Sequence, residues 1–583
     1  MNSTLPEINP QSELASCDLL LNYLEKIGVE FIFGIPGGAI EPLYNALAKS
    51  EKRGGIRAIT ARHETGAVFM ADAYARNTGK LGVCCSTTGP GATNMITGIA
   101  SSYENNTPLL IITPQTAQEK VGKKALQDSG DTGINIPGMF QFFTKYSSYV
   151  SHVGQFEHKL VSAIMSALSS PSGPAHLSIP NDILKSSVPI KQQPINLANV
   201  LRHPKLKDEN AIQELLAELN NSKKTIFVIG AGAKDCNTLI AQCIEQLDIE
   251  FVSTPDGKGF INPNHPLYRG VIGFAGHKSA SKALQNNEVD TVVIIGSSLG
   301  ELASNAWDQL TLLNSKLIHI DSNQENFTRS SMAKLQVGGH IPTTLEAILN
   351  NCNTLINIQT ETHSKSVIDN KKLLHFELEE PVKTTDESTP LKPQYVMTQL
   401  TQVFPANARY LADSGNNTAW AIHYLNPSYE RSTNANHTQI CIDFGSMGWS
   451  VGSAIGTALA HPNDPVVCIV GDGAFLMSGN EITVALEENL NIIFLILNDQ
   501  QLGMVKHGQL LNKAADIANK LPNINYALMA TAMGIASQTV ETSDDLLNLD
   551  ITQMCNRNGP TLLDVRIDPN EAPPIVTRLI GMK

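Results

Sequence analysis

The chain has 583 residues, too many for one hydrophobic core, so we expect three or four domains. Its composition, with 42% hydrophobic and 17% charged residues, is that of an ordinary globular protein. The formal net charge of −13 argues against nucleic acid or an anionic membrane as the main partner, and no apolar run reaches the roughly 18 residues of a membrane span.

The first predicted domain covers residues 12–185. It opens with a helical apolar pattern, CDLLLNYLEKIG, and then alternates helical stretches with short apolar runs that we interpret as strands. The predicted strands are FIFGIPG, LGVCCSTT, LLIIT and AHLSIP. Between them, RHETGAVFMADAYAR (62–76) has the pattern of a helix with Glu64 near its start. A carboxylate at that place is favoured by the helix dipole, which is one explanation of Glu64.

The second predicted domain covers residues 205–350 and again alternates strands with helices. Its predicted strands are TIFVIGAG, IEFVSTP, TVVIIGSS and KLIHIDS. The run VIGAGAKD (228–235) carries two of the three glycines of a dinucleotide-binding turn, so we interpret it as a tight turn between a strand and a helix. Residues 351–390 are polar and charged, which is typical of a linker.

The third predicted domain covers residues 391–575. Two apolar runs, VVCIV (466–470) and IIFLIL (492–497), flank a helical pattern, and QICIDF (439–444) is a further strand-like run. Because strand and helix alternate in all three parts, we predict an α/β protein with three doubly wound parallel-sheet domains.

Two acidic residues follow the strands of the third domain. Asp472 lies in the turn Gly471-Asp472-Gly473 after the first run, and Asp499 ends the second run 27 positions later. Parallel strands joined by a helix end at the same edge of a sheet, so the two carboxylates should lie together beside a helix N-terminus. Carboxylate oxygens suit Mg²⁺, and the phosphates of a diphosphate would complete its shell. The alternative is a turn aspartate and a capping aspartate in an ordinary βαβ unit.

The stretch from Gly471 to Asp499 resembles the thiamin diphosphate (ThDP) binding motif, in which GDG is followed further along the chain by NN or ND. GIPGGAI (34–40), TTGPGATNMITGIASSYENNTPLLIIT (87–113) and KKALQD (123–128) match the acetolactate (acetohydroxyacid) synthase group in wording and order. The resemblance extends from about residue 12 to 570 and implies a pyrimidine-binding, a central and a diphosphate-binding domain.

The resemblance implies where the cofactor binds. Mg²⁺ would be held by Asp472, by the side chain of Asp499, where most members have Asn, and by the backbone carbonyl of Gln501. Met447 would force the bent conformation of the cofactor, or it could simply fill the core. Further implied cofactor contacts are Pro36, Gly415, Asn416, Asn417, Ser446, Gly471, Gly473, Ala474 and Met504. Asn and Gly are also ordinary turn residues.

The resemblance also assigns catalytic and substrate contacts. Glu64 would hydrogen-bond N1′ of the aminopyrimidine ring, where the reaction requires proton exchange. Gly38 and Gln127 would face the reacting carbon, although Gln127 equally fits a solvated loop. The implied substrate pocket contains Gly37, Leu126, Val505 and Gly508. Because the family builds this site from two subunits, we expect a homodimer as the smallest active unit.

Three positions depart from the biosynthetic members of the group. Gly508, in LGMVKHGQ, stands where those members have tryptophan, Leu126 replaces phenylalanine, and Asn181 replaces lysine. The missing indole leaves room for a larger or differently shaped acceptor. Lys506 and His507 could meet an anionic or polar group there, or form an exposed loop pair.

The second domain departs as well. FAD-binding members have an arginine at a strand end that reads GSSLGEL (296–302) in this chain. In those members the guanidinium is a partner for the flavin phosphates, and without it we expect no tightly bound FAD.

We therefore predict a ThDP- and Mg²⁺-dependent enzyme that decarboxylates a 2-ketoacid such as pyruvate and joins the product to a second carbonyl. The alternatives are a decarboxylase that does not ligate, a ligase with an unusual acceptor, and a non-catalytic homologue. The nine scattered cysteines form no CxxC pair, and the N-terminal residues lack the pattern of a secretory signal. We accordingly expect buried free thiols and a cytoplasmic location.

Overall fold

The computed structural model describes residues 13–189, 195–202, 205–352, 374–427 and 438–575. They form two compact units, which we describe separately. The first unit holds the described part of Met1–His203 together with Val451–Pro462 and Ser478–Leu490, and the second unit holds the rest. The predicted domain boundaries at 12–185, 205–350 and 391–575 stay predictions, and residues 353–373 of the predicted linker lie outside the described residues.

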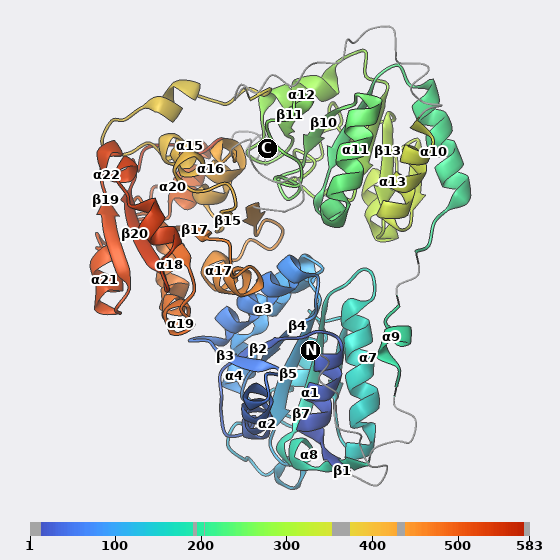
Figure 1. Ribbon diagram of the computed structural model, residues 1–583, viewed down its shortest axis with the longest axis vertical. Helices are drawn as coiled ribbons and strands as arrows, with labels where there is room; N and C mark the ends of the chain where they lie inside the picture. Colours follow the sequence, from blue (N-terminus) through green and yellow to red (C-terminus); the bar gives the residue numbers. More distant parts are fainter. Residues whose placement is uncertain (1–12, 190–194, 203–204, 353–373, 428–437, 576–583) are drawn as a thin grey trace. The chain divides into compact units, whose positions relative to one another are not determined.

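A parallel six-stranded sheet forms the core of the first unit, in the order β3-β2-β4-β5-β7-β6 (Figure 1). Its strands are β2 (Phe31–Gly34), β3 (Arg57–Thr60), β4 (Gly82–Cys85), β5 (Leu109–Gln115), β6 (Tyr146–Tyr149) and β7 (Pro174–Pro180). A two-stranded antiparallel sheet joins β1 (Glu13–Ala15) to β8 (Ser187–Pro189). Every residue of β5 and β7 is buried, as expected for a parallel sheet covered on both faces.

Helices cover this sheet on both faces. They are α1 (Ser16–Lys26), α2 (Glu41–Lys52), α3 (Glu64–Thr78), α4 (Pro90–Asn94), α5 (Ile96–Glu104), α6 (Ile136–Phe140), α7 (Phe156–Leu168), α8 (Asn181–Lys185) and α9 (Leu197–Val200). Apolar side chains of α1, α2 and α7 pack into one cluster with the strands. On α3, the backbone approaches β4 closely, since a Cβ on Gly82 would lie 2.5 Å from the carbonyl oxygen of Ala71.

Two later parts of the chain complete the first unit. Most of α17 (Trp449–Ala460) belongs to it, as do the short helix η6 (Gly479–Glu481) and α19 (Ile482–Glu487). Glycine allows α17 to lie directly on α3, because a Cβ on Gly456 would come within 2.1 Å of the carbonyl oxygen of Met70.

The second unit contains two more parallel six-stranded sheets. The central sheet has the order β11-β10-β9-β12-β13-β14. Its strands are β9 (Thr225–Ile229), β10 (Glu250–Ser253), β11 (Tyr268–Val271), β12 (Thr291–Ile295), β13 (Leu317–Asp321) and β14 (Leu335–Gly338). Its main helices are α10 (Glu209–Asn221), α11 (Asn237–Leu247), α12 (Lys278–Gln285) and α13 (Ile341–Asn350). Two separate apolar clusters pack against it.

The C-terminal sheet has the order β16-β15-β17-β18-β20-β19. Its strands are β15 (Arg409–Ala412), β16 (Thr438–Ile440), β17 (Val466–Gly471), β18 (Ile492–Asn498), β19 (Ala536–Val540) and β20 (Thr561–Arg566). The helices around it are α15 (Pro393–Val403), α16 (Asn416–Tyr424), α18 (Asp472–Ser478), α20 (Gly503–Leu511), α21 (Tyr526–Ala532), α22 (Ser543–Leu547) and α23 (Ile551–Cys555). A turn of 3₁₀ helix, Pro381–Thr385, precedes α15.

The strand order places a topological switch point in each sheet. The first strand of each sheet lies inside it, the next strand lies on one side, and the chain then crosses to the other side. Ligands of open α/β sheets bind at such a switch point, beyond the carboxyl ends of the strands. The switch points lie between β2 and β4, between β9 and β12, and between β15 and β17.

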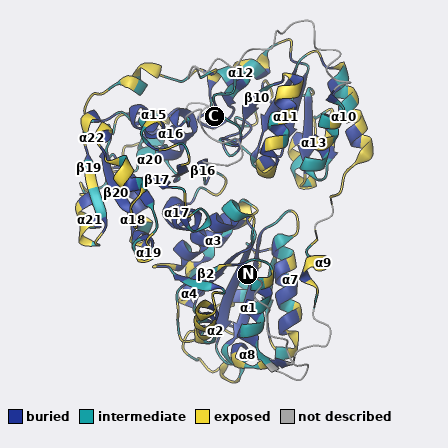
Figure 2. Cartoon of the chain, in the orientation of Figure 1, coloured by how far each residue is buried: buried dark blue, intermediate teal, exposed yellow. Residues whose placement is uncertain are grey.

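The predicted fold class, three doubly wound parallel-sheet domains, is confirmed. The predicted strand at 439–444 is shorter than expected, because β16 is an edge strand that pairs with β15 over only three residues and ends at Ile440. Figure 2 shows inner strands such as β17 as buried, and it shows the edge strand β19 and the outer side of helix α10 as partly exposed.

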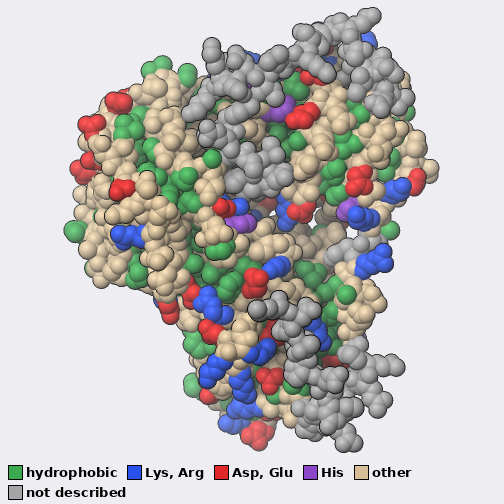
Figure 3. All heavy atoms as spheres, viewed as in Figure 1, with side chains coloured by type: hydrophobic (Ala, Val, Ile, Leu, Met, Phe, Trp, Pro, Cys, Tyr) green, Lys and Arg blue, Asp and Glu red, His purple; other side chains and the backbone are tan. Residues whose placement is uncertain are grey.

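Two further properties are the distribution of charged side chains on the surface and the apolar character of the helices. Basic and acidic side chains are interspersed on the face that Figure 3 shows. Within the described part of the chain, no helix combines the length and the apolar character that crossing a membrane requires.

Candidate active site

The two predicted metal ligands meet at the carboxyl edge of the C-terminal sheet. β17 and β18 pair in parallel, so that the residues after each strand lie side by side. Asp472 is the first residue of α18, and its Oδ2 accepts the backbone N–H of Gln500 at 2.8 Å. Asp499 immediately precedes Gln500, which places the second carboxylate next to the first. The geometry that the sequence suggested is therefore present in the fold.

These two carboxylates are held in an unfavourable environment for negative charge. Asp472 is 2% exposed, and burial followed by the charge of Asp499 raises its pKa to about 7. Burial raises the pKa of Asp499 to about 6. A divalent cation between them would relieve both effects. Among the described residues, no group of three or more His, Cys, Asp or Glu is placed to hold a metal. A cation between these two carboxylates therefore needs further oxygen ligands, which the phosphates of a bound ligand would supply.

Polar groups from α16 converge on the same edge. Gly415 has φ 117°, and Asn416 and Asn417 begin the helix immediately after it. A Cβ on Gly503 would lie 2.4 Å from Asn416 Nδ2 and 2.7 Å from Asp499 Oδ2. A Cβ on Gly471 would likewise lie 3.2 Å from Asn417 Oδ1.

Buried oxygens at this edge have no hydrogen-bond partner among the described residues. They include Oδ1 of Asn416, Oγ of Ser446 and Oδ1 of Asn498. A buried polar atom without a partner is costly, and such atoms in a native structure commonly mark a site for a ligand, ion or water. Together with the carboxylate pair, they fit a metal that carries a diphosphate.

Met447 reaches the GDG turn from the loop before α17. Its Cε lies 3.7 Å from the place that a Cβ on Gly473 would take, and 37% of the residue is exposed. Ala474, the residue after Gly473, is buried in α18. Met447 therefore presents an apolar side chain beside the residues that would bind the diphosphate.

A short segment that contains Gln501 follows Asp499, and the helix α20 then begins at Gly503. Gln501 donates its side-chain amide to Asp499 Oδ2 at 3.2 Å, and His507 Nδ1 lies 3.1 Å from Asn416 Nδ2. Lys506 Nζ donates to the carbonyl oxygen of Pro569 at 3.1 Å. Burial and the nearby charge of Lys506 lower the pKa of His507. Lys506 and His507 therefore lie in the helix α20 and do not form an exposed loop.

The remaining predicted positions of α20 differ in their surroundings. Met504 packs against an apolar cluster that includes Phe274 and Ile422, and Val505 is 46% exposed. No heavy atom lies within 4 Å of the place of a Cβ on Gly508. Near the start of this segment, a cavity of about 720 Å³ opens beside Asp499 and Arg566.

The predicted catalytic residue lies in the first unit. Glu64 is the first residue of α3 and is 8% exposed. Its Oε2 accepts the side-chain amide of Asn94 at 2.9 Å, and its Oε1 lies 3.1 Å from the place of a Cβ on Gly91. His63 is the N-cap of this helix, and its Nδ1 accepts the N–H of Thr65 at 3.2 Å.

The turn after β2 lies next to the turn after β4. A Cβ on Gly37 would lie 2.6 Å from Cβ of Thr87, so only glycine allows this approach. Pro36 and Gly38 are exposed, and a Cβ on Gly38 would meet no atom within 4 Å. Asn181 donates its amide to the carbonyl oxygen of Ala39 at 2.8 Å and so supports this turn.

Gln127 belongs to the same edge. It has φ 58°, an uncommon conformation for a residue other than glycine, and its carbonyl oxygen accepts the hydroxyl of Thr88 at 3.2 Å. Gly89, in the turn after β4, packs against Gln127, and the preceding residue Leu126 is 88% exposed. Gly37, Glu64 and Gln127 are therefore brought together through the turn after β4.

Sequence reasoning missed one residue that supports Glu64. The carboxylate of Glu481 accepts the backbone N–H groups of Arg62, at 3.1 and 3.2 Å, and of His63, at 2.8 Å. Burial, as the largest cause, raises the pKa of Glu481 to about 7. Glu481 and His63 are 418 positions apart, so no local pattern could have shown the contact.

The central sheet uses its glycines for close packing of backbone. The N–H of Gly232 donates to the carbonyl oxygen of Gly296 at 2.8 Å, and a Cβ on Gly230 would lie 2.4 Å from the same oxygen. The turns after β9 and β12 therefore touch at the switch point, which agrees with a tight turn between strand and helix.

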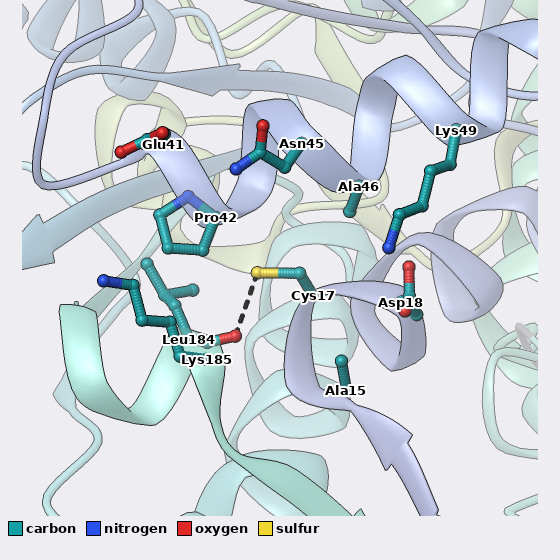
Figure 4. A pocket seen from close by; sticks show the side chains of 10 residues that line it. All are labelled: Ala15, Cys17, Asp18, Glu41, Pro42, Asn45, Ala46, Lys49, Leu184 and Lys185. Carbon is teal, nitrogen blue, oxygen red and sulfur yellow. Dashed lines mark hydrogen bonds between the residues drawn. The ribbon is translucent and has the colours of Figure 1, made fainter.

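A second cavity, of about 310 Å³, lies among α1, α2 and α8 in the first unit (Figure 4). Cys17 Sγ donates to the carbonyl oxygen of Leu184 at 3.2 Å, and Lys49 and Asp18 line the same cavity. Burial raises the pKa of Cys17 to about 12, so its thiol is protonated and inert at neutral pH. None of the candidate site residues lines this cavity.

Comparison with known families identifies all three sheets. The model of the thiamine pyrophosphate enzyme N-terminal TPP binding domain matches residues 16–133, and that of the central domain matches 212–348. The model of the C-terminal TPP binding domain matches residues 413–565. The first and third matches contain Glu64, Asp472 and Asp499.

Curated relatives match over nearly the whole chain. The acetolactate synthase large subunit of Lactococcus lactis subsp. lactis is 30% identical, with 97% of this chain and 95% of the relative covered. The probable acetolactate synthase large subunit of Methanococcus aeolicus is 29% identical over 95% of this chain and 92% of the relative. Acetolactate synthase isozyme 1 large subunit of Escherichia coli K12 is 27% identical over 96% and 95%.

Proposed function

The chain belongs to the acetolactate synthase family of ThDP (thiamine pyrophosphate) enzymes, and on that premise we propose that it decarboxylates pyruvate and joins the remaining two carbons to a second carbonyl. ThDP-dependent decarboxylation and carboligation come with family membership. The proposal adds three specific points: the donor is pyruvate, the metal is Mg²⁺, and the product is an acetolactate-like 2-hydroxyketone. One observation supports it most: the carboxylates of buried Asp472 and half-buried Asp499 are neighbours and lie among buried oxygen atoms without hydrogen-bond partners.

We assign the diphosphate end of the cofactor to the second unit. Asp472, Asp499 and the carbonyl of Gln501 would hold Mg²⁺. Asn416 and the backbone around Gly473 would donate hydrogen bonds to the phosphates. Further contacts with the cofactor would come from Gly415, Asn417, Ser446, Gly471, Ala474 and Met504, together with Pro36 from the first unit. When bound, ThDP supplies the electron sink that accepts the electrons of the bond broken as CO₂ leaves.

We assign proton exchange to Glu64. Its carboxylate lies in a mostly buried environment, and Asn94 fixes one of its oxygens. A carboxyl so placed would hold and return the proton at N1′ of the aminopyrimidine ring. Met447 would contact the cofactor and hold it in its bent conformation, and positioning of this kind supplies a large part of many rate enhancements.

We assign the substrate pocket to the turns beyond β2 and β4 and to α20. Gly37, Gly38 and Gln127 would face the donor, and Leu126, Val505 and Gly508 would surround the acceptor. The open space at Gly508 supports an acceptor that differs in size or shape from that of the biosynthetic enzymes. Because the family builds this site from two subunits, with the counterparts of Glu64 and Asp472 on different chains, we further propose that a homodimer completes the site. The lack of an arginine in GSSLGEL (296–302) supports the proposal that no FAD binds tightly.

Replacement of Glu64 by Gln tests the mechanism. Gln keeps the size and the hydrogen bond from Asn94 but exchanges no proton, so turnover of pyruvate with ThDP and Mg²⁺ should be abolished while the protein stays folded. Glu157→Gln is a matched control, since Glu157 is also 8% exposed in the same unit and accepts the hydroxyl of Tyr23 at 2.5 Å. Activity near that of the wild type in Glu64→Gln contradicts the proposed role.

A further inference from the structure

A fully buried carboxylate lies behind the candidate site, and no role has yet been given to it. Asp413 follows β15 directly and is 0% exposed. Its Oδ1 accepts the backbone N–H of Gly448 at 2.8 Å, and its Oδ2 accepts the backbone N–H of Ser450 at 2.7 Å. The side chain of Ser450 also hydrogen-bonds this carboxylate. Asp413 thereby ties the end of β15 to the start of α17.

The backbone of Asp413 is bonded on two other sides. Its N–H donates to the carbonyl oxygen of Ile469 in β17 at 2.9 Å. Its carbonyl oxygen accepts the side-chain amide of Asn417 at 2.6 Å and the hydroxyl of Thr418. One residue at the switch point therefore joins β17, the first turn of α16 and the segment 448–450.

A negative charge on the buried Asp413 costs free energy, and a structural role of this side chain would account for that cost. Burial raises the pKa of Asp413 to about 6, against the opposing effect of its hydrogen bonds. The groups that bind the carboxylate are neutral N–H and hydroxyl donors, so the hydrogen bonds themselves must offset the loss of water. A carboxylate that accepts backbone N–H groups at the start of a helix fixes the conformation of that backbone.

The backbone fixed in this way carries Met447. Gly445 and Gly448 flank this residue with φ 67° and 82°, so the turn follows a path that only glycine adopts readily. Asp413 holds the turn from the buried side through Gly448. On the other side, Met447 Cε lies 3.7 Å from the place of a Cβ on Gly473.

We propose that Asp413 is a positioning residue: its carboxylate holds the turn Gly445–Ser450 so that Met447 is presented to the cofactor site. This inference rests on the proposed function, in which Met447 supports the bound cofactor. Asp413 itself touches neither cofactor nor substrate in this account and acts through Met447.

A double-mutant cycle with pyruvate, ThDP and Mg²⁺ tests the proposal. Asp413→Asn keeps the shape but turns an NH₂ group toward one of the two N–H donors, which loosens the turn. We expect kcat to fall by about ten- to a hundredfold, because a misplacement of about 1 Å near the reacting atoms has effects of that order. KM for pyruvate should stay within about threefold of the wild type, since the donor contacts are untouched.

The second arm of the cycle uses Met447→Ala. If Asp413 acts through Met447, Asp413→Asn should lower kcat by less than about twofold in the Met447→Ala background. An equal loss in both backgrounds would overturn the inference while leaving the proposed function intact. If Met447→Ala alone has wild-type kcat, the proposed support of the cofactor by Met447 fails, and the inference fails with it.

Two further variants guard against simple loss of folding. Ser450→Ala removes one hydrogen bond to Asp413 and leaves the backbone donors in place, so a smaller loss of kcat with the same dependence on Met447 is expected. Asp290→Asn is the matched control, because Asp290 also accepts two backbone N–H groups, those of Lys223 and Lys224, but in the central sheet. Wild-type kcat in Ser450→Ala and Asp413→Asn, or an equal loss in Asp290→Asn, contradicts the inference.

Discussion

Restoring tryptophan at Gly508 should change which acceptor the enzyme prefers. A Cβ at this position meets no heavy atom within 4 Å, so the new side chain has space. Gly508 lies five residues after Gly503, which approaches Asp499, and an α-helix rises about 1.5 Å per residue. The indole would therefore begin about 7.5 Å along α20 from the metal site, within reach of a substrate bound there.

The magnitude follows from apolar area. If the indole covers about 60 Å² of an acceptor, it contributes about 1.5 kcal/mol, which is about tenfold in kcat/KM. We expect Gly508→Trp to favour small 2-ketoacid acceptors over bulky ones by about this factor. The assay is competition between a small and a bulky acceptor with pyruvate as donor, with products quantified by mass spectrometry.

Gly508→Ala is the control for the helix itself. Ala fills the open space without reaching a substrate, and it should stabilise α20 by about 0.5–1 kcal/mol without altering the acceptor ratio. A folded Gly508→Trp enzyme that binds ThDP but keeps the wild-type acceptor ratio within about twofold would refute the reasoning.

Three more predictions follow from single contacts. Asp499→Asn keeps an oxygen ligand for the metal and removes the repulsion between this side chain and Asp472. The concentration of Mg²⁺ that half-activates the enzyme should therefore rise by no more than about tenfold, and the product should stay the same. Complete loss of activation by Mg²⁺ would contradict this. The raised pKa of Glu481 means that its contribution to stability is present below pH 4.5 and is lost as the pH rises to about 7, by an amount of order 3 kcal/mol. Glu481→Gln should therefore gain in thermal unfolding temperature relative to the wild type between pH 5 and pH 8, and a constant difference would show the reasoning to be wrong. Gly456→Ala should destabilise the protein by about 1–3 kcal/mol, because its Cβ would meet the backbone of Met70 at 2.1 Å, and an unfolding temperature equal to that of Gly508→Ala would contradict the packing.

The interior strands were predictable because they are continuous apolar runs. VVCIV and IIFLIL became β17 and β18, and their positions gave the edge at which Asp472 and Asp499 meet. The edge strand β16 was overestimated, since the apolar residues after Ile440 pack elsewhere: Ile442 contacts the cluster around Phe274. An apolar sequence pattern indicates that residues are buried, but residues at the edge of a sheet can be buried without pairing in a strand.

The long-range contacts of the site were not predictable. Asp413 reads as an ordinary residue at the end of a strand, and only the fold brings Gly448 and Ser450 to its carboxylate. Glu481 reads as part of a helical pattern, although its carboxylate binds the backbone before Glu64. Hydrogen bonds from a side chain to distant backbone leave no periodic trace in the sequence.

The most direct test of the account is the product formed from ¹³C-labelled pyruvate by the full chain. With ThDP and Mg²⁺ both present, we expect labelled CO₂ and a 2-hydroxyketone with a new carbon–carbon bond, and neither when ThDP or Mg²⁺ is omitted. Labelled acetaldehyde as the sole product would show that the enzyme decarboxylates without ligation. Turnover that is unchanged without ThDP and Mg²⁺ would contradict the central claim.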